Sequence, residues 1–578
     1  LELGTWQNAS FDDDQWKPVL LVRPPVGKLE AQTAPFDKVV RTLTPTLEEK
    51  KGAVSKFRLS ETVSGWASIR VKGKAGSQLK IRYISEENQD YGQSDTYILK
   101  GGGAEDWHPR FTWHAFRDLE VTSSDESLIL ESLVVEDVHT AVTGAGTFEC
   151  SNPLFNTIHS AYLKTQRANL HGSVSSDCPH RERLGYTGDG QVAIESALYT
   201  FDLFQFYSKW INDMDDARNK KTGFVTHTAP FGGGGGGPAW GSAYVTMPWS
   251  YYNRYGDASL LQQHYIGMKQ WVTYLQTRTN EKGLVDKEEP NGWCLGDWCT
   301  PYPIELPEPL VNTAYFYHVT NIMSKVAQTL GKKDDQAKFV ALANKIKTDF
   351  NAAYYNDSKK SYWEGKQGAN AFALAFELVP QDKQSLVFGS LIEGLKQTNH
   401  HFDTGILATP LLMDVLSQNG RDDIVFALMN QRDFPSFGYL LDDKNSTLWE
   451  SWDGHDSKCH PMFGSVVAWF YNGLGGIKTD PASPGMKHFV IEPKTVSDLD
   501  YCKASYKSLY GQIRSEWKKT EGGKYQFIIE VPANTSATFV LPDGKEKVTT
   551  ESGKGLPVVK FQGKRAVEFK SGVYRFDS

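Results

Sequence analysis

The sequence predicts a multidomain protein in which a closed all-α barrel lies between β domains, and three observations support this. The length, 578 residues, exceeds what one ordinary hydrophobic core organises. Apolar residues alternate with a period of two up to about residue 145, and near Cys150 the period changes to about 3.6. After about residue 480 the period returns to two. We therefore expect a β-sandwich at 31–145, an all-α domain at 146–480 and a C-terminal β-sandwich at 481–578.

The first β domain is indicated by short, regularly spaced strands. The segments "ASIRVKG", "QLKIRYISE" and "FRDLEVTS" alternate apolar and polar residues and are rich in β-branched and aromatic types. Clusters of Gly, Asn, Asp and Ser separate them. This pattern predicts a sandwich of the jelly-roll kind.

The central region repeats amphipathic helices. "PLFNTIHSAYLKTQ" places apolar residues on one helical face behind a Ser151/Asn152 cap. No fixed sequence period links the helices, which argues against a solenoid. A closed barrel in which inner helices alternate with outer ones fits better, with an active face built from long loops. Further helical windows are predicted at 191–217, 241–254, 258–277, 312–331, 334–354, 369–378, 382–397, 404–418, 421–431 and 461–473.

Composition excludes several functional classes. The formal net charge is -7, and no block of five like charges occurs, so there is no electrostatic case for nucleic acid or an anionic membrane. No run of 18 apolar residues predicts a membrane span. The six cysteines have no metal-like spacing, and we interpret them mostly as buried thiols, with one disulfide left open. No targeting signal is visible; we expect a periplasmic or secreted protein, with the cytoplasm as the alternative, and the oligomeric state stays open.

The segment "SSDCPHRERLGYTGDG", residues 175–190, gathers three carboxylates, Asp177, Glu182 and Asp189, around two arginines. Proline and glycine interrupt any regular helix here, so the acids are presented from a loop, where catalytic groups often lie. Flanking arginines lower the pKa of a carboxyl group, so Glu182 needs burial or neighbouring acids to act as a proton donor. The alternative is a salt-bridged turn.

A second acidic cluster is "NSTLWESWDGHDSKCHPMFG", residues 445–464, where Glu450 lies between Trp449 and Trp452. A carboxylate between indoles has its proton affinity raised by a dry wall, or works as a base beside a sugar ring. The alternative is a polar residue between two core tryptophans.

Aromatic loops accompany both clusters. One holds Trp240 and Trp249 after the six glycines 232–237, and another holds Asp297 and Trp298. The glycine run reads as a flexible surface loop, or as backbone that lets a ligand approach closely. Two separated acids with Trp and Tyr around them are what glycoside hydrolysis requires.

These residues carry a resemblance to a known family. "DCPHRERLGYTGD" resembles the signature of the bacterial α-L-rhamnosidases, family 78 of the glycoside hydrolases, although it has one residue fewer between Arg181 and Glu182 than the "RDER" version. "HFDTGILATPLLMDVLSQNG", "DFPSFGYLL", "STLWESWDG" and "HPMFGSVVAWFY" resemble further blocks in the family's order. The upstream "ASFDDDQW" and "HPRFTWHAFRDLEV" resemble its accessory β domains, and "VPANTSATFVLP" resembles its C-terminal sandwich. Residues 1–30 resemble the tail of an accessory β domain whose beginning is missing.

The resemblance implies an (α/α)6 barrel and an exo-acting, inverting glycosidase that releases terminal α-L-rhamnose. Glu182 corresponds to the general acid and Glu450 to the general base, with the two carboxyl groups ~6.5 to 9.5 Å apart to admit a water. No metal or cofactor is implied, and the partner is a rhamnosylated carbohydrate. The substrate-binding candidates are Asp177, Arg181, Tyr186, Asp189, Trp240, Trp249, Asp297, Trp298, Trp452 and His460.

Two departures from the family pattern concern sugar specificity. Tyr186 stands where Trp is more usual, and Ser242 stands where many members carry Asp. Two alternatives stay open at this point. The first is an (α/α) barrel hydrolase or lyase for another sugar such as a uronic acid, which for a lyase calls for an Arg or Lys cluster facing Tyr186 or His460. The second is a glycan-binding protein without turnover.

Overall fold

The computed structural model describes residues 6–24, 27–289, 292–303, 306–441, 447–542, 548–549 and 555–577. Two compact units are present: Leu1–Pro35 with Val39–Val138, and Phe36–Lys38 with His139–Ser578. The first is built on a β-sheet, and the second combines a large helical region with another sheet. The predicted multidomain organisation, a helical domain accompanied by β-sheet domains, is therefore confirmed.

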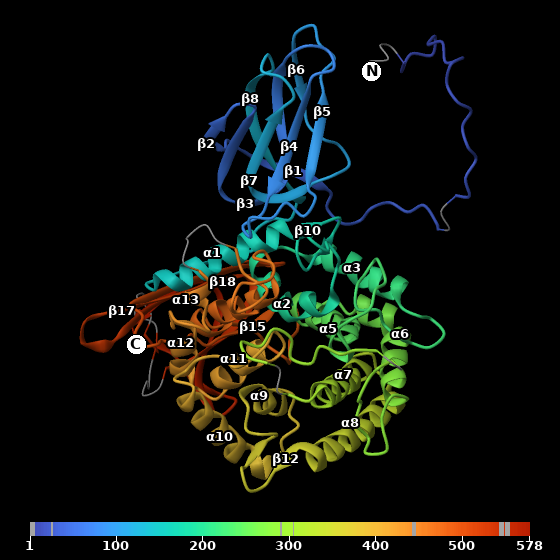
Figure 1. Cartoon of the computed structure of the whole chain (residues 1–578). Coiled ribbons are helices and arrows are strands. Elements are labelled where there is room, and N and C mark those ends of the chain that lie inside the picture. Colours follow the sequence, from blue (N-terminus) through green and yellow to red (C-terminus); the bar gives the residue numbers. More distant parts are fainter. Residues whose placement is uncertain are drawn as a thin grey trace. The chain divides into compact units, whose positions relative to one another are not determined.

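The first sheet has eight strands in the order β1-β8-β3-β7-β4-β5, with β2 and β6 also pairing with β3 (Figure 1). Its long strand β3 alternates buried and exposed side chains, and the buried ones, such as Ala67, Ile69 and Val71, build a separate apolar core. The described part of the predicted tail, residues 6–24 and 27–30, contains no strand. The strands are β1 Asp37–Leu43, β2 Thr46–Lys51, β3 Val54–Lys72, β4 Gln78–Ile84, β5 Ser94–Ile98, β6 Ala104–Trp107, β7 His114–Ser123 and β8 Ile129–Thr140.

The helical region follows, from cyan at α1 through green and yellow to orange in Figure 1. Its first helix begins at the predicted cap, where the Asn152 side chain accepts from the Leu154 amide. The helices are α1 Pro153–Ala168, α2 Thr187–Thr200, α3 Phe204–Ala217, α4 Pro238–Gly241, α5 Ala243–Tyr255, α6 Ser259–Gln276, α7 Glu308–Thr329, α8 Lys333–Tyr354, α9 Gln367–Ala375, α10 Gln384–Gln397, α11 Ala408–Gln418, α12 Asp422–Met429 and α13 Phe437–Leu440.

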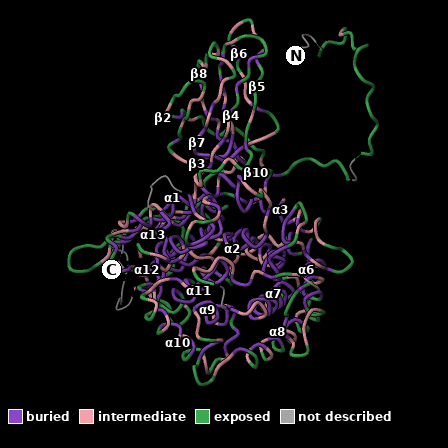
Figure 2. Tube along the Cα trace, viewed as in Figure 1, coloured by how far each residue is buried: buried purple, intermediate pink, exposed green. Residues whose placement is uncertain are grey.

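An inner set of helices forms a closed circuit of contacts. Helix α2 contacts α5, α5 contacts α7, α7 contacts α9, and α9 contacts α11; the 3₁₀ segment Met462–Val467 then contacts both α11 and α2. Helix α7 is buried on nearly all sides, whereas α8 is buried along one stripe only. Figure 2 shows the same contrast between the buried trace of α2 and the exposed outer faces of α8 and α10. A helix apolar all round belongs in an interior, and one with a single stripe covers it.

Two predicted helical windows differ from the structure. The window 191–217 is divided after Thr200, because Phe201 is extended and bridges Gly144 while the Asp202 amide donates to the Thr143 carbonyl. The window 461–473 forms a 3₁₀ segment and a π turn, Phe470–Leu474, rather than a regular α-helix. The sequence pattern gives the burial of these segments, but a strand from elsewhere decides where the first one breaks.

The second sheet has the order β14-β15-β18-β17-β16-β9, with β22 paired to β18 and β21 to β22. Strand β9 precedes all the helices, so residues 146–150, predicted as the start of the helical domain, belong to this sheet. Its core residues form one apolar cluster with those of the helices. The strands are β9 Gly146–Cys150, β14 Ile477–Thr479, β15 His488–Ile491, β16 Tyr501–Ser508, β17 Gly511–Lys519, β18 Tyr525–Val540, β21 Val558–Phe561 and β22 Lys564–Asp577.

No helix among the described residues has the length and apolar character needed to cross a bilayer. The six cysteines are free thiols, and all except Cys299 are buried. The disulfide that the sequence left open is therefore not formed in this structure.

Candidate active site

The first acidic cluster lies in the loop between the short strand β11, Val174–Ser175, and the start of α2 at Thr187. The Asp177 amide donates to the Leu184 carbonyl at 3.0 Å, and the Leu184 amide donates to Asp177 Oδ1 at 3.1 Å. These two bonds close the loop upon itself and fix the Asp177 carboxylate. Asp189 lies in the first turn of α2, where the helix dipole stabilises a negative charge.

Arg181 joins the two acidic clusters. Its Nε donates to Glu182 Oε2 at 2.6 Å, and its Nη2 donates to Glu450 Oε2 at 2.7 Å. Asp456 lies further away, with its Oδ1 3.9 Å from Nη1. One guanidinium therefore holds together the two glutamates that the sequence singles out from distant segments.

Glu450 belongs to the loop that precedes the 3₁₀ segment Met462–Val467; Asn445 and Ser446 of this predicted cluster lie outside the described residues. The Glu450 amide donates to the Ser457 carbonyl at 2.8 Å, and the Ser457 amide donates to Glu450 Oε2 at 3.2 Å. The side chain is buried, unlike that of Glu182, which is exposed. The two carboxylates therefore differ in access to solvent although they share a partner.

His460 places a further cation behind the glutamates. Its Nε2 lies 2.8 Å from Asp189 Oδ1 and its Nδ1 lies 3.6 Å from Glu450 Oε2. Burial alone would lower the pKa of this imidazole, but Glu450 and Asp189 raise it to about 9. His460 is therefore protonated at neutral pH and neutralises part of the charge of the carboxylates around it.

Asp177 and Glu182 have opposite pKa shifts. Burial raises the pKa of Asp177 to about 7, assisted by the charges of Asp189 and Glu182 and opposed by His460. Burial also favours a higher pKa for Glu182, but the hydrogen bonds from Arg181 and Cys178 outweigh burial and lower the pKa to about 2. In this arrangement Glu182 is ionised at neutral pH, whereas Asp177 keeps its proton to a much higher pH than Glu182 does.

The Cys178 thiol lies between these two acids. Its Sγ is 2.9 Å from Glu182 Oε2 and 3.3 Å from Asp177 Oδ2. One ligand atom from each of the three residues falls within 4.8 Å of the others, which raises the question of a metal. Burial, Asp177 and Glu182 hold the pKa of Cys178 well above its usual value, so the thiol keeps its proton and donates a hydrogen bond. A metal ion binds the thiolate and would displace this proton, so the trio as the structure has it is joined by hydrogen bonding from the thiol.

The predicted aromatic residues have different environments. Tyr186 is half-buried, and burial together with Asp177, Glu182 and Asp189 raises its pKa to about 12, which places its hydroxyl among the acids. Trp249 and Trp298 are half-buried. These rings remain partly accessible, as contacts to a sugar require.

Trp240 is only 2% exposed and is clasped by backbone on both sides. A side-chain carbon added at Gly188 or at Gly236 would lie 2.4 or 2.5 Å from its ring. Gly235 approaches the Trp293 ring in the same way. The glycine run therefore lets the backbone approach closely, which was one of its two interpretations. In this structure the backbone approaches the protein's own indole rings rather than a ligand.

Three predicted contact residues, Trp240, Trp452 and Asp297, lie in the interior instead. The Trp452 ring packs between Phe402 and Phe463, with centroid distances of 5.3 and 4.6 Å, and its Nε1 donates to the Thr404 carbonyl. Its assignment as a substrate contact was wrong, and the alternative reading of a core tryptophan was right. Ser242 is also fully buried, with its hydroxyl donating to the Pro238 carbonyl at 2.6 Å.

Asp297 is the second correction. Its carboxylate accepts from the backbone amides of Gly405, Leu407 and Ala408 at 2.8, 3.0 and 3.0 Å, and it is 0% exposed. These amides belong to the turn that leads into α11, so the carboxylate caps that turn. Since no oxygen faces solvent, Asp297 fixes the loop and does not contact a ligand.

Sequence reasoning missed two groups of the site. Cys178 was interpreted only as a buried thiol, although its place four residues before Glu182 is a signal for contact. The Ser457 amide, which binds Glu450, gives no signal in the sequence because every residue carries a backbone N–H.

Three family models match the chain in succession. They are the bacterial α-L-rhamnosidase concanavalin-like domain at residues 51–140, the bacterial α-L-rhamnosidase 6 hairpin glycosidase domain at 143–474, and the bacterial α-L-rhamnosidase C-terminal domain at 476–556. The central match includes every residue of the site described above.

Individual relatives agree with these models. The chain is 32% identical to an α-L-rhamnosidase of Streptomyces avermitilis, with 100% of this chain and 57% of that protein covered. The solved α-L-rhamnosidase from Dictyoglumus thermophilum is 33% identical, with a TM-score of 0.91 and coverage of 100% of this chain and 68% of that one. The Streptomyces avermitilis structure complexed with L-rhamnose is 31% identical, with a TM-score of 0.87 and coverage of 100% and 57%. The chain thus spans little more than half of its Streptomyces relative.

Proposed function

This chain belongs to the bacterial α-L-rhamnosidase family, and we propose that it is an exo-acting, inverting α-L-rhamnosidase. Its substrates are rhamnosides or rhamnose-bearing oligosaccharides and polysaccharides, from which it releases terminal α-L-rhamnose. The observation that carries the proposal is the pair of glutamates, Glu182 and Glu450, gathered on the guanidinium of Arg181. Two carboxyl groups at one site supply the acid and the base of glycoside hydrolysis.

Accessibility distinguishes the roles of the two glutamates. Glu182 is exposed, so it can reach the glycosidic oxygen and act as the general acid. Glu450 is buried and held by the Ser457 amide, which suits a base that aims a water at the anomeric carbon from the opposite face. Inversion requires room for that water, and we expect ~6.5 to 9.5 Å between the two carboxyl groups when substrate is bound.

A general acid must carry a proton, and Glu182 with a pKa of about 2 does not. We therefore propose that substrate displaces the Arg181 Nε–H from Glu182, after which desolvation raises the pKa of Glu182. Asp177, with a pKa of about 7, supplies a protonated neighbour in the same loop. The buried side chain of Asp177 makes it a poorer direct donor to a glycosidic oxygen than Glu182.

The circuit α2, α5, α7, α9, α11 and 462–467 supports an (α/α)6 barrel, with α1, α3, α6, α8, α10 and α12 as the alternating outer helices. In this proposal the acids lie on the loops before the inner helices. The remaining contacts to rhamnose come from Asp177, Arg181, Tyr186, Asp189, Trp249 and Trp298, with His460 behind them. The β domains that precede and follow the barrel in the sequence would be sandwiches.

The environment of Tyr186 and His460 supports a hydrolase over a lyase. Carboxylates face both groups: Asp189 and Glu450 lie against His460, and Asp177 raises the pKa of Tyr186. A uronate at this position would be repelled by those charges.

Substitution of each glutamate by glutamine tests the roles. We expect Glu182→Gln and Glu450→Gln each to lower kcat/KM for a methyl or alkyl α-L-rhamnoside by ~10²- to 10⁴-fold, the usual contribution of a general acid or base. An aryl rhamnoside with a good leaving group should restore much of the rate of Glu182→Gln, because the leaving group no longer needs a proton, but not that of Glu450→Gln. Glu393→Gln, at an exposed pair with Lys396, is the matched control.

The stereochemical course is measured by NMR of the first-formed sugar. We expect β-L-rhamnose before mutarotation. Release of α-L-rhamnose first would refute inversion, and unchanged hydrolysis by either glutamine variant would refute the assignment of that residue.

A further inference from the structure

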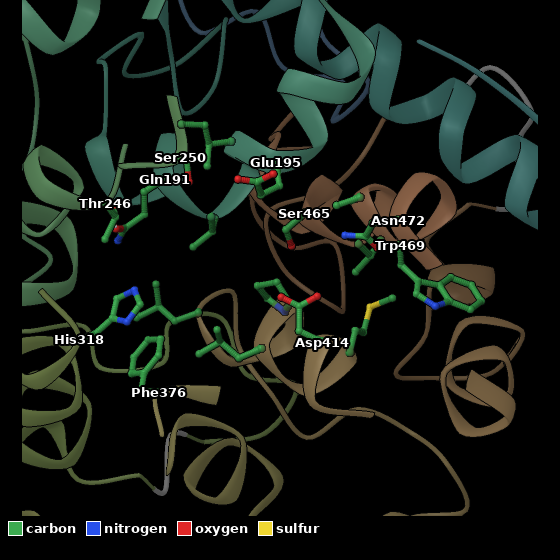
Figure 3. Close-up of a pocket in the computed structure, with 18 of the residues that line it drawn as sticks. Gln191, Glu195, Thr246, Ser250, His318, Phe376, Asp414, Ser465, Trp469 and Asn472 are labelled. Carbon is green, nitrogen blue, oxygen red and sulfur yellow. The ribbon is translucent and has the colours of Figure 1, made fainter. Parts of the chain in front are cut away.

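A cavity separate from the acidic loops, which we call the axial cavity, lies among the inner helices (Figure 3). Its volume is about 210 Å³, and residues of α2, α5, α7, α11 and the segment 462–474 line it. Drug-sized ligands occupy ~300 to 1,000 Å³, so this cavity suits a smaller molecule. None of the residues assigned above to acid, base or sugar contact lines it.

The cavity is displaced from the candidate active site along α2. Asp189 belongs to the site, whereas Glu195, six residues later on the same helix, lines the cavity. At 1.5 Å per residue this is ~9 Å along the axis. Asp414 likewise lies within α11, beyond the turn capped by Asp297.

The two carboxylates in this cavity differ in their counter-charges. Asp414 is accessible, and among the described residues no hydrogen bond or ion pair reaches its carboxylate. Glu195 lines the same space and is paired with Arg254 Nη2 at 3.0 Å. No lysine or arginine lines the cavity. Figure 3 shows the Asp414 and Glu195 carboxylates facing each other across the open space.

A second polar group without a partner faces the same space. Ser465 is only 5% exposed, and its Oγ has no hydrogen-bond partner. In Figure 3 its hydroxyl points toward the open space between Glu195 and Asp414. A buried hydroxyl without a hydrogen bond costs the folded state ~1 to 3 kcal/mol relative to a hydroxyl with a partner. This wall of the cavity is therefore suited to a ligand that forms a hydrogen bond with Ser465.

The rest of the lining is apolar and aromatic. Val192, Ile194, Leu407 and Leu411 contribute aliphatic surface, and Phe376 is stacked on His318 with a centroid distance of 4.0 Å. Burial, together with Lys325, lowers the pKa of His318 to about 3, so it adds no positive charge. The cavity thus combines one negative polar corner with an apolar wall.

We propose that this axial cavity binds a small organic ammonium ion, with its N–H groups on Asp414 and Ser465 and its hydrocarbon body against Phe376 and Leu411. A carboxylate in a concave, low-dielectric wall attracts a cation more strongly than one on an open surface. Although Asp414 is accessible, desolvation of its carboxylate within the cavity and the charge of Glu195 raise its pKa to about 7, against the charge of Lys478. A bound cation would relieve that unfavourable environment. The proposal is independent of the rhamnosidase assignment.

The test uses two probes of equal size and different charge, cyclohexylammonium and cyclohexanol, titrated calorimetrically into the whole chain at pH 8. We expect the cation to bind at least tenfold more tightly than the alcohol. Asp414→Asn should remove this preference while leaving cyclohexanol binding unchanged. Asp216→Asn, at an exposed aspartate on α3, is the matched control and should have no effect.

Equal affinity for the two probes, cation binding that survives in Asp414→Asn, or no binding of either probe would overturn the proposal. Saturating L-rhamnose provides the second arm. Rhamnose that displaces the cation would place the cation at the acidic loops and also overturn it, whereas independent binding supports two sites. Activity measurements on the Glu182 and Glu450 variants test the proposed function separately and do not change the interpretation of cation binding in the axial cavity.

Discussion

The acidic loops and the axial cavity both hold carboxylates in confined surroundings, but they neutralise them differently. In the loops, Arg181 contacts Glu182 and Glu450 while protonated His460 contacts Asp189. In the cavity, Glu195 is paired with Arg254, and no described group forms a hydrogen bond or ion pair with the Asp414 carboxylate. The difference shows that a cluster of acids has to be interpreted together with the cations that neutralise it. The first cluster is a closed network, which the proposed function requires a substrate to open, and the second holds the open position that we propose a ligand fills.

Arg181→Met breaks the compensated side of this comparison and carries the largest expected effect. Without the guanidinium, Glu182 and Glu450 repel each other, the pKa of Glu182 rises from about 2, and neither carboxylate is held. We expect kcat/KM for an alkyl α-L-rhamnoside to fall ~10²- to 10³-fold, since misplaced catalytic groups lose this much. The measurement is a pH–rate profile of wild type and variant.

Arg181→Lys is the companion variant, because it keeps the charge and loses the fork that reaches two carboxylates. An intermediate rate for the lysine variant supports bridging by Arg181. A methionine variant with wild-type activity and an unshifted profile would show that Arg181 does not organise the glutamates.

Asp297→Ala extends the comparison to a third buried carboxylate, which is stabilised by backbone amides alone. Three N–H groups of the turn before α11 lose their acceptor, and each buried unsatisfied group costs about 1 kcal/mol or more. We expect destabilisation by ~3 kcal/mol, measured as a lower Tm. Asp297→Asn should be milder, because it retains one acceptor oxygen. If Tm is unchanged but KM rises, Asp297 contacts substrate after all.

These cases show what the sequence could and could not supply. The acids of 175–190 and Glu450 were predicted because their motifs place carboxylates in loops, and the alternation of periods predicted the succession of sheet, helices and sheet. Trp452 and Asp297 were misassigned because a motif gives proximity along the chain but not the direction of a side chain. The break after Thr200 and the place of β9 in the second sheet depend on partners more than 50 residues away. Local patterns do not encode such partners.

Cys178→Ala tests the Cys178 thiol, which is an uncharged hydrogen-bond donor among the acids of the candidate active site. The thiol donates to Glu182 Oε2 at 2.9 Å, and this bond helps to hold the carboxylate in the orientation that the proposed general acid needs. We expect a ~3- to 10-fold fall in kcat with little change in KM, because a single neutral hydrogen bond is worth ~0.5 to 1.5 kcal/mol. Cys178→Ser keeps a donor and should recover most of the loss. Equal rates for alanine and serine would assign Cys178 to packing alone.

Asp414→Asn has the smallest expected effect and tests the axial cavity, where the Asp414 carboxylate has no ion-pair partner among the described residues. The pKa of Asp414 is about 7 in the folded chain and near ~3.9 when unfolded, so the folded state binds this proton more tightly. Its contribution to stability is therefore largest below pH ~4 and is lost as pH rises to ~7. The asparagine variant should match wild type at pH 4.5 and exceed it at pH 8 by about 1 kcal/mol, discounted because Asp414 is accessible to water.

The expected rise in Tm at pH 8 is ~1 to 2 °C, and Asp216→Asn should show none. Glu182 titrates with the opposite sign: its pKa of about 2 means that its contribution is present above pH ~4.5 and is lost as pH falls toward 2. A Tm difference for Asp414→Asn that is the same at both pH values would mean that Asp414 is ionised throughout. The cavity would then already hold a counter-charge, and the contrast between the two regions would disappear.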